Sequence, residues 1–394
     1  MLAPAISGLA GDSSGASGRP AARPTPIRRL GAESPGGLAL PAARPTPAQL
    51  YAPRGVFLDD ERLIVADSGN HRVLIWHGLP ASDGAGADLV LGQPDFLSEG
   101  PAAGGRGPAN GLFLPTGVLV AAGRLYVADA WHHRVLVWER VPEHAATPPD
   151  YALGQASLTT VEPNRGAAPS ALGLYWPYGI AVVAGWFYVA DTGNRRVLGW
   201  NGLPEPGQPP DLVLGQPTPD ATAENRGGPP SSASFRWPHA IAGDDTTLYV
   251  ADAGNHRVLG WSPPPVADRP ADLVLGQPDF TSAQEVPYLP QGPARLRFPY
   301  ALAYEHGLLA VADTANNRVL GWEPAPRSGA GAPATLVIGQ EHFAATGENR
   351  WRAVASDTLC WPYGLCFHHG RLAIADSGNN RVMLWSLTLT EGAP

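Results

Sequence analysis

The sequence repeats one hairpin pattern six times, and this repeat constrains the fold more than any other feature. In the first copy an apolar run ends at Asp67, a turn follows at Ser68-Gly69-Asn70, and a second apolar run leads from Arg72 to Trp76. Such a turn between two β-branched runs is typical of a β-hairpin. The aspartates of successive copies are 61 to 63 residues apart: Asp67, Asp129, Asp191, Asp252, Asp313 and Asp376. A fixed period of this kind indicates a repeat architecture.

Two further markers recur in phase with the hairpin. Each of the first five units continues to a segment like Leu89–Gln93, and each of the six begins with a proline and a short run of small residues, as in Pro53–Val56. The unit therefore contains four strands: one after the proline, two in the hairpin and one before the glutamine. Four-stranded units repeated around an axis form a β-propeller. The sequence predicts an all-β, six-bladed propeller of antiparallel blades.

The two ends of the sequence complement each other in this scheme. No Leu-Gly-Gln segment follows Trp385, whereas Leu30-Gly31 lies 61 residues before Leu91-Gly92, in phase with the fourth strands. We therefore expect Ile27–Gly31 to complete the sixth blade and close the ring, which also covers an exposed strand edge. Residues 1–26 are rich in Gly, Ser, Ala and Pro and are predicted to be disordered, with residues 27–394 forming one propeller domain.

The motifs resemble those of the NHL-repeat family, in proteins of the bacterial type. The family is named for an Asn-His-Leu triplet in the hairpin turn, and this chain has Asn70-His71-Arg72 and Asn255-His256-Arg257, with Arg in place of Leu. The resemblance covers roughly residues 27 to 390. It implies a six-bladed propeller but says little about function, because propellers support many unrelated activities.

Composition excludes some classes of partner. The net charge is −8, and all 27 basic residues are arginine. Some animal NHL propellers bind RNA through a positive face, but an acidic chain without basic clusters is poorly suited to contact a phosphate backbone. No apolar run reaches the length of a membrane span. The N-terminus lacks a basic region followed by an apolar run, so we expect a cytoplasmic protein, and we also expect a monomer.

Two cysteines, Cys360 and Cys366, are too few for a disulfide framework in a chain of 394 residues. We expect both to be buried thiols.

Each hairpin contains an aspartate and, five residues later, an arginine. A ring of six such pairs could bind an anion. The alternative is structural: the aspartate caps the turn while the arginine bonds the carboxylate and loop carbonyls. Sixfold repetition favours the structural interpretation, because a single ligand rarely needs six equivalent contacts. The pairs are Asp67/Arg72, Asp129/Arg134, Asp191/Arg196, Asp252/Arg257, Asp313/Arg318 and Asp376/Arg381.

The residue after each proline varies while its neighbours repeat, so the scaffold does not dictate its identity. In a propeller this position lies at the mouth of the central channel. A small polar or anionic ligand could bind there, although a water-filled mouth is the alternative interpretation. The six residues are Arg54, Thr116, Tyr178, His239, Tyr300 and Tyr363.

Four arginines in the long loops between blades form a second candidate set: Arg106, Arg165, Arg226 and Arg350. They either face a partner or hold their own loops by bonding carbonyl groups. Strand parity places these loops, the hairpin turns and the channel mouth on one face of the propeller.

Metal and cofactor chemistry find little support in the sequence. One NHL-like group, the peptidyl-α-hydroxyglycine lyases, holds zinc with three channel histidines, but His239 is the one histidine at the six mouth positions. We expect no metal and no cofactor, and neither a Gly-x-Ser-x-Gly motif nor a phosphate loop is present.

The predicted function is non-enzymatic: a binding or scaffolding propeller that recognises a protein or small ligand. The alternative is an enzyme, lyase- or hydrolase-like, or a small-ligand receptor with its site at the channel mouth.

Overall fold

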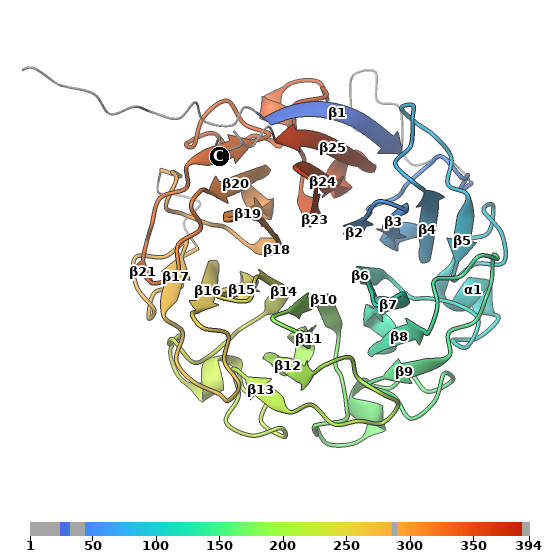
Figure 1. The fold of residues 1–394 in the computed structure, drawn as a ribbon, viewed down its shortest axis with the longest axis horizontal. Coiled ribbons are helices and arrows are strands. Elements are labelled where there is room, and N and C mark those ends of the chain that lie inside the picture. Colours follow the sequence, from blue (N-terminus) through green and yellow to red (C-terminus); the bar gives the residue numbers. More distant parts are fainter. Residues whose placement is uncertain (1–23, 32–43, 286–289, 388–394) are drawn as a thin grey trace, which may run out of the picture.

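A computed structural model describes residues 24–31, 44–285 and 290–387. Six sheets are arranged radially around a central axis, and in each the four main strands run outward in antiparallel order (Figure 1). The predicted six-bladed propeller is confirmed. Within the described residues, no helix is long and apolar enough to cross a membrane.

The first three blades follow the predicted four-strand order. The first blade contains β2 (Gly55–Leu58), β3 (Arg62–Asp67), β4 (Arg72–His77) and β5 (Leu89–Leu91). The second contains β6 (Pro115–Ala121), β7 (Arg124–Asp129), β8 (Arg134–Trp138) and β9 (Tyr151–Leu153). The third contains β10 (Pro177–Val183), β11 (Trp186–Asp191), β12 (Arg196–Asn201) and β13 (Leu212–Leu214).

The other three blades repeat this order with one addition. The fourth contains β14 (Pro238–Gly243), β15 (Leu248–Asp252), β16 (Arg257–Trp261) and β17 (Leu273–Leu275). The fifth contains β18 (Pro299–Glu305), β19 (Leu308–Asp313), β20 (Arg318–Trp322) and β22 (Leu336–Ile338). The sixth contains β23 (Pro362–His368), β24 (Arg371–Asp376), β25 (Arg381–Leu387) and β1 (Pro24–Gly31). The addition is β21 (Gly329–Ala330), a fifth-blade segment that pairs in parallel with β17 and covers the edge of the fourth blade.

Helical structure is short and confined to turns and loops. The hairpin turns contain 3₁₀ segments η1 (Ser68–Asn70), η2 (Ala130–His132), η4 (Thr192–Asn194), η6 (Ala253–Asn255), η7 (Thr314–Asn316) and η9 (Ser377–Asn379). The long loops contain α1 (Pro101–Gly105), η3 (Pro163–Gly166), η5 (Glu224–Gly227) and η8 (Glu348–Trp351).

The N-terminal strand closes the ring as predicted. β1 is antiparallel to β25, with Gly31 opposite Arg381 and Pro24 opposite Leu387 (Figure 1). The strand begins at Pro24, three residues before the expected start at Ile27, and its pairing shifts between Pro26 and Arg28. The predicted disordered segment otherwise falls on residues 1–23, which lie outside the described residues.

The hydrophobic core lies between neighbouring blades. One cluster joins Trp261 of the fourth blade to Tyr188 and Leu212 of the third. In the first five blades the indole N–H of the equivalent tryptophan donates to a carbonyl of the following connection, as Trp76 does to Ala85 at 3.0 Å. The sixth, Trp385, has a buried indole nitrogen without such a partner among the described residues. The tryptophans thus pack between blades and also fix most of the connections.

The two cysteines are free thiols. Cys360 is buried, and Cys366 is half-buried beside the first blade, where its Sγ accepts a bond of 3.3 Å from the Leu58 N–H. Burial raises the pKa of both thiols to about 12, so both stay protonated at neutral pH.

Candidate functional site

The hairpin Asp–Arg pairs lie buried beneath the propeller face that carries the hairpin turns and long loops, which we call the candidate face. In the first blade both side chains are fully buried, and Arg72 Nε lies 2.7 Å from Asp67 Oδ2. The other carboxylate oxygen accepts the Tyr51 backbone N–H at 2.6 Å. The remaining guanidinium nitrogens donate to carbonyls of the loop before the blade and the loop after it, at Thr46, Gln49 and Phe96. The pair therefore joins two long loops, a geometry that supports the structural interpretation over an anion-binding ring.

A second set of hairpin residues links each blade to the next. The residue after each 3₁₀ turn has a left-handed backbone conformation, which His and Asn adopt more readily than most residues. His71 Nδ1 accepts the Leu114 N–H at 3.1 Å, and Asn317 Oδ1 accepts the Trp361 N–H at 3.0 Å. His133, His256 and Asn380 make the same contact with Trp176, Phe298 and Ala52. We call these five contacts the inter-blade hydrogen bonds.

The junction between the third and fourth blades lacks this bond. Arg195 occupies the turn position, and a guanidinium has no acceptor to offer. The five residues that donate to a turn side chain have φ between 46° and 54°, a conformation that Trp237 at this junction does not share. Instead the Trp237 N–H contacts Asp252 Oδ1 at 3.3 Å, and the Trp237 carbonyl accepts from His239 Nδ1 at 2.9 Å. The ring is thus asymmetric at His239.

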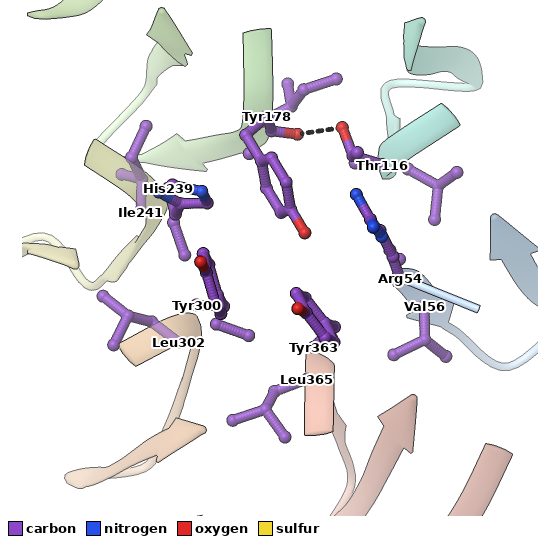
Figure 2. Close-up of a pocket in the computed structure, with 18 residues that line it drawn as sticks. Arg54, Val56, Thr116, Tyr178, His239, Ile241, Tyr300, Leu302, Tyr363 and Leu365 are labelled. Carbon is purple, nitrogen blue, oxygen red and sulfur yellow. Dashed lines mark hydrogen bonds between the residues drawn. The ribbon is translucent and has the colours of Figure 1, made fainter. Parts of the chain in front are cut away.

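The structure brings the six variable residues together at one end of the inner strands. Together with the next two residues of each strand they line a cavity of about 80 Å³ (Figure 2). Such a cavity has room for a few water molecules or a small ionic group. We call Arg54, Thr116, Tyr178, His239, Tyr300 and Tyr363 the mouth residues.

Aromatic rings occupy one side of the mouth. The His239 ring centroid lies 4.4 Å from those of Tyr178 and Tyr300, and Tyr300 stacks on Tyr363 at 4.8 Å. The guanidinium carbon of Arg54 lies 5.2 Å from the centre of the Tyr363 ring, a cation–π distance. Thr116 lies next to Arg54, in the neighbouring blade, and its hydroxyl donates to the Tyr178 carbonyl at 3.0 Å (Figure 2). Thr116 thus joins two blades, and its proton is not free for a ligand.

The protonation states of the mouth follow from burial. Burial lowers the pKa of His239 to about 3, so this imidazole is neutral at physiological pH, and its Nδ1–H donates to a carbonyl. Burial also raises the pKa of Tyr300 to about 12 and raises the pKa of Tyr178 further. Arg54 is therefore the one charged side chain among the six mouth residues.

The Tyr178 hydroxyl is the exceptional polar group of the mouth. Tyr178 is 4% exposed, and its hydroxyl makes no hydrogen bond of standard geometry with a described residue. The Arg54 guanidinium beside it interacts with this hydroxyl and partly offsets the rise in pKa that burial causes. Figure 2 shows the hydroxyl pointing into the cavity, between Arg54 and Tyr363. A buried polar group without a partner costs about 1–3 kcal/mol, so this geometry favours an occupant that accepts a hydrogen bond.

Below the mouth the channel is narrow and apolar. A Cβ added to Gly55 would lie 1.9 Å from the Thr116 carbonyl oxygen, and one added to Gly179 would lie 2.3 Å from that of His239. The inner strands therefore contact each other through their backbones. Aliphatic side chains, including Ile241 and Leu302, line the next layer of the cavity (Figure 2). A charged ligand would be stabilised at the mouth and not deeper.

Three of the four predicted loop arginines bond their own loops. Arg165, Arg226 and Arg350 each donate to a carbonyl at the end of the preceding fourth strand, at 3.2–3.3 Å. Arg226 also pairs with Asp268 at 2.6 Å, and Arg350 with Asp357 at 2.7 Å. Arg106 follows α1 and does not repeat this contact. The geometry of the three supports a loop-holding role more than a partner-facing one.

Exposed aromatic residues lie on the same face as the mouth, a feature that the repeat pattern does not indicate. Among the described residues, every exposed Phe, Tyr or Trp side chain belongs to this face, in the hairpin turns or the long loops; they are Tyr51, Trp131, Tyr175, Trp351 and Trp361. Trp351 is 81% exposed. We call this set the aromatic rim. Aromatic residues at an exposed surface are enriched in recognition sites, because they bury a large area with few rotatable bonds.

Comparison with known proteins adds information about the fold. No family model matches the sequence. No curated protein matches it. The structure is similar to a structural genomics protein of unknown function from Bacteroides thetaiotaomicron, with a TM-score of 0.50 and 13% identity, covering 93% of this chain and 76% of that one. This likeness concerns the fold alone.

Two other solved structures are less similar. Virginiamycin B lyase from Staphylococcus aureus matches with a TM-score of 0.43 and 11% identity, covering 87% of this chain and 97% of that one. A nidogen/laminin complex matches with a TM-score of 0.43 and 14% identity, covering 84% and 87%. Neither match supports an inference about function.

Proposed function

We propose that this protein is a non-enzymatic binding propeller that recognises a carboxylate-bearing ligand at the mouth. The observation that carries the proposal is the buried Tyr178 hydroxyl, which points into the cavity beside Arg54 and makes no hydrogen bond of standard geometry with a described residue. A carboxylate accepts hydrogen bonds from both a phenol and a guanidinium, and charge-assisted bonds of this kind are roughly twice as strong as neutral ones. An anion would thus satisfy both groups together.

The protonation states favour binding over catalysis. A general acid or base works best with a pKa near the operating pH. Burial holds the pKa of His239 near 3 and that of Tyr300 near 12, far from neutrality on opposite sides. No pair of neighbouring mouth residues resembles a nucleophile and its base. The enzymatic alternative therefore has less support than the binding role.

The size of the cavity limits what enters it. About 80 Å³ accommodates a carboxylate group but not a whole cofactor. The rest of the ligand would lie across the aromatic rim, where Trp351 and Trp361 offer apolar area. A peptide or protein partner that inserts a carboxylate fits this arrangement.

We also propose that the chain is an NHL-repeat protein, which the hairpin motifs support. We propose further that it is a cytoplasmic monomer.

The experiment compares short aromatic-containing peptides that differ at one group. We expect peptides with a free C-terminal carboxylate to bind more tightly than the same peptides with an amidated C-terminus, as measured by isothermal titration calorimetry. Acetate alone should compete only weakly, because it lacks the contacts to the rim. Equal affinity for the free and amidated peptides would reject a carboxylate as the recognised group.

Variants of the mouth localise the binding. Tyr178→Phe and Arg54→Met should each weaken the peptide by about 1–3 kcal/mol, the usual range for losing a buried or charged polar contact. Tyr188→Phe is the matched control, because its hydroxyl is also buried without a partner among the described residues but lies in β11, outside the mouth. An equal loss of peptide affinity in Tyr188→Phe would show that the mouth variants act through the stability of the fold and not through contacts with the peptide.

A further inference from the structure

A cluster of histidine and carboxylate groups lies on the face opposite the mouth. His368 is the last residue of β23 and His369 follows it in the turn to β24, while the turn between β2 and β3 carries Asp60. The two turns belong to the last and first blades, which are neighbours in the closed ring (Figure 1). His368 and Asp60 are 308 residues apart in sequence, so ring closure is what brings them together.

Two separations between the ligand atoms are close to those of a transition-metal site. Nε2 of His368 lies 2.9 Å from Oδ1 of Asp60, a hydrogen bond that a metal ion would replace, and Nε2 of His369 lies 3.5 Å from the same oxygen. The three ligand atoms all lie within 4.8 Å of one another. Tetrahedral ligands at the usual zinc distance of about 2.0–2.1 Å are about 3.3 Å apart. A metal ion could therefore bind with small side-chain movements.

Neighbouring carboxylates hold both turns in place. Glu305, at the end of β18, accepts the backbone N–H groups of His369 and Gly370 at 2.8 and 2.7 Å. Asp59 accepts the N–H groups of Glu61 and Arg62 at 2.9 and 2.7 Å. The backbones that present the ligands are thus fixed before any ion arrives, which reduces the entropy lost on binding.

We propose that Asp60, His368 and His369 form a binding site for a divalent transition-metal ion, with Zn²⁺ as the expected occupant. Two imidazoles and one carboxylate suit zinc and its neighbours better than magnesium or calcium, which prefer oxygen ligands. His369 and Asp60 are 65% and 76% exposed, so water completes the coordination. The ion joins the first blade to the last and stabilises the closed ring by mass action.

The site is independent of the mouth and differs from the channel zinc site considered from the sequence. The expectation that the chain binds no metal rested on the absence of a set of three channel histidines, and the repeat pattern places His368 and His369 at an inner-strand end. This cluster lies there, at the ends of the inner strands away from the mouth, and its third ligand is the carboxylate of Asp60. Asp60 lies in a turn between strands, where the repeat pattern gave no reason to select it.

The test uses Zn²⁺ alone, titrated into the full-length, tag-free protein after chelator treatment. We expect about one equivalent to bind and the melting temperature to rise by several degrees. Asp60→Asn and His368→Gln should each weaken Zn²⁺ binding at least tenfold and remove the thermal shift. His306→Gln is the matched control, because His306 occupies the corresponding exposed turn of the fifth blade outside the cluster, and this variant should bind as the wild type does.

A variant of Glu305 tests the supporting contact separately. Glu305→Gln should weaken binding by about 10- to 100-fold while all three ligands remain. Absence of Zn²⁺ binding by the wild type at millimolar concentration would overturn the proposal. Binding that persists unchanged in Asp60→Asn and His368→Gln would also overturn it. Melting of each variant without metal shows whether it is folded, and the Co²⁺ absorption spectrum gives a second measure of coordination.

Discussion

Nδ1 of His256 in the fourth blade accepts a hydrogen bond of 3.2 Å from the backbone N–H of Phe298, which precedes the first strand of the fifth blade. The same contact recurs at four other junctions, with either His or Asn as the acceptor. The residue that follows each 3₁₀ turn, His256 in this blade, thus has a defined physical role. It satisfies an amide of the next blade that the strand pairing leaves without a partner.

Replacing the acceptor should destabilise one junction. His256→Ala leaves the Phe298 N–H without its partner and places alanine in a left-handed conformation, so we expect a loss of about 1–3 kcal/mol in the free energy of unfolding. His256→Asn should retain most of the stability, because asparagine fills this position in the fifth and sixth blades. Chemical denaturation of both variants measures the difference. Equal losses in the two would show that the hydrogen bond contributes nothing.

The inter-blade hydrogen bonds should make stability depend on pH. Burial lowers the pKa of His133 and of His256 from 6.5 to about 4. Between pH 6.5 and pH 4 these histidines bind protons in the unfolded chain but not in the folded chain. The free energy of unfolding therefore falls as the pH falls from 6.5 towards 4. Each unit of pKa difference corresponds to about 1.4 kcal/mol.

The double variant His133→Asn, His256→Asn should show a smaller loss over the same range, because asparagine does not titrate. Melting temperatures of the wild type and variant at pH 7, 6, 5 and 4.5 measure the two slopes. Parallel slopes would show that these histidines do not control the acid response.

Ring closure can be tested by truncation. Deleting residues 1–23 leaves β1 intact and should change the melting temperature little. Deleting residues 1–31 removes β1 and exposes the edge of β25, so we expect a decrease of several degrees or aggregation. Calorimetry and light scattering measure the two effects. Equal behaviour of the two truncations would contradict a role for β1 in stability.

The close approach of the inner strands predicts a steric effect. Gly55→Ala places a methyl group 1.9 Å from the Thr116 carbonyl oxygen, so the first two blades must separate locally, at a cost of about 1–3 kcal/mol. Gly292→Ala is the control, because a Cβ there meets no atom within 4 Å. Unfolding free energies of the two variants give the comparison, and an equally stable Gly55→Ala would show that the strands can move apart freely.

Most of the fold could be predicted because it is repeated. The number of blades follows from the period of the hairpin and of the strand after each proline, which one sequence shows. The closure follows from the missing fourth strand of the last unit and the extra Leu30-Gly31 segment near the N-terminus. The mouth positions could be predicted because Tyr178 and His239 vary where their neighbours repeat. The strand β21 could not, because Gly329-Ala330 pairs with a different blade and carries no strand-like pattern.

Other features required the three-dimensional structure. Asp60 and His368 meet through ring closure, which no local pattern records. The aromatic rim combines Tyr51 and Trp351 from different loops, and their exposure depends on how each loop folds. The inter-blade hydrogen bonds could have been inferred from one signal, the restriction to His or Asn at five of six turns, with Arg195 as the exception.

Arg195 has a consequence for how a ligand can sit on the molecule. A ring with six identical junctions would offer six equivalent orientations, and a ligand would gain nothing by choosing among them. The junction at Arg195 differs from the other five, because Trp237 has another backbone conformation and His239 donates to the Trp237 carbonyl. This difference breaks the sixfold symmetry of the ring. A partner bound at the mouth can therefore adopt one preferred orientation about the propeller axis. Each loop of the face then contacts a particular part of that partner.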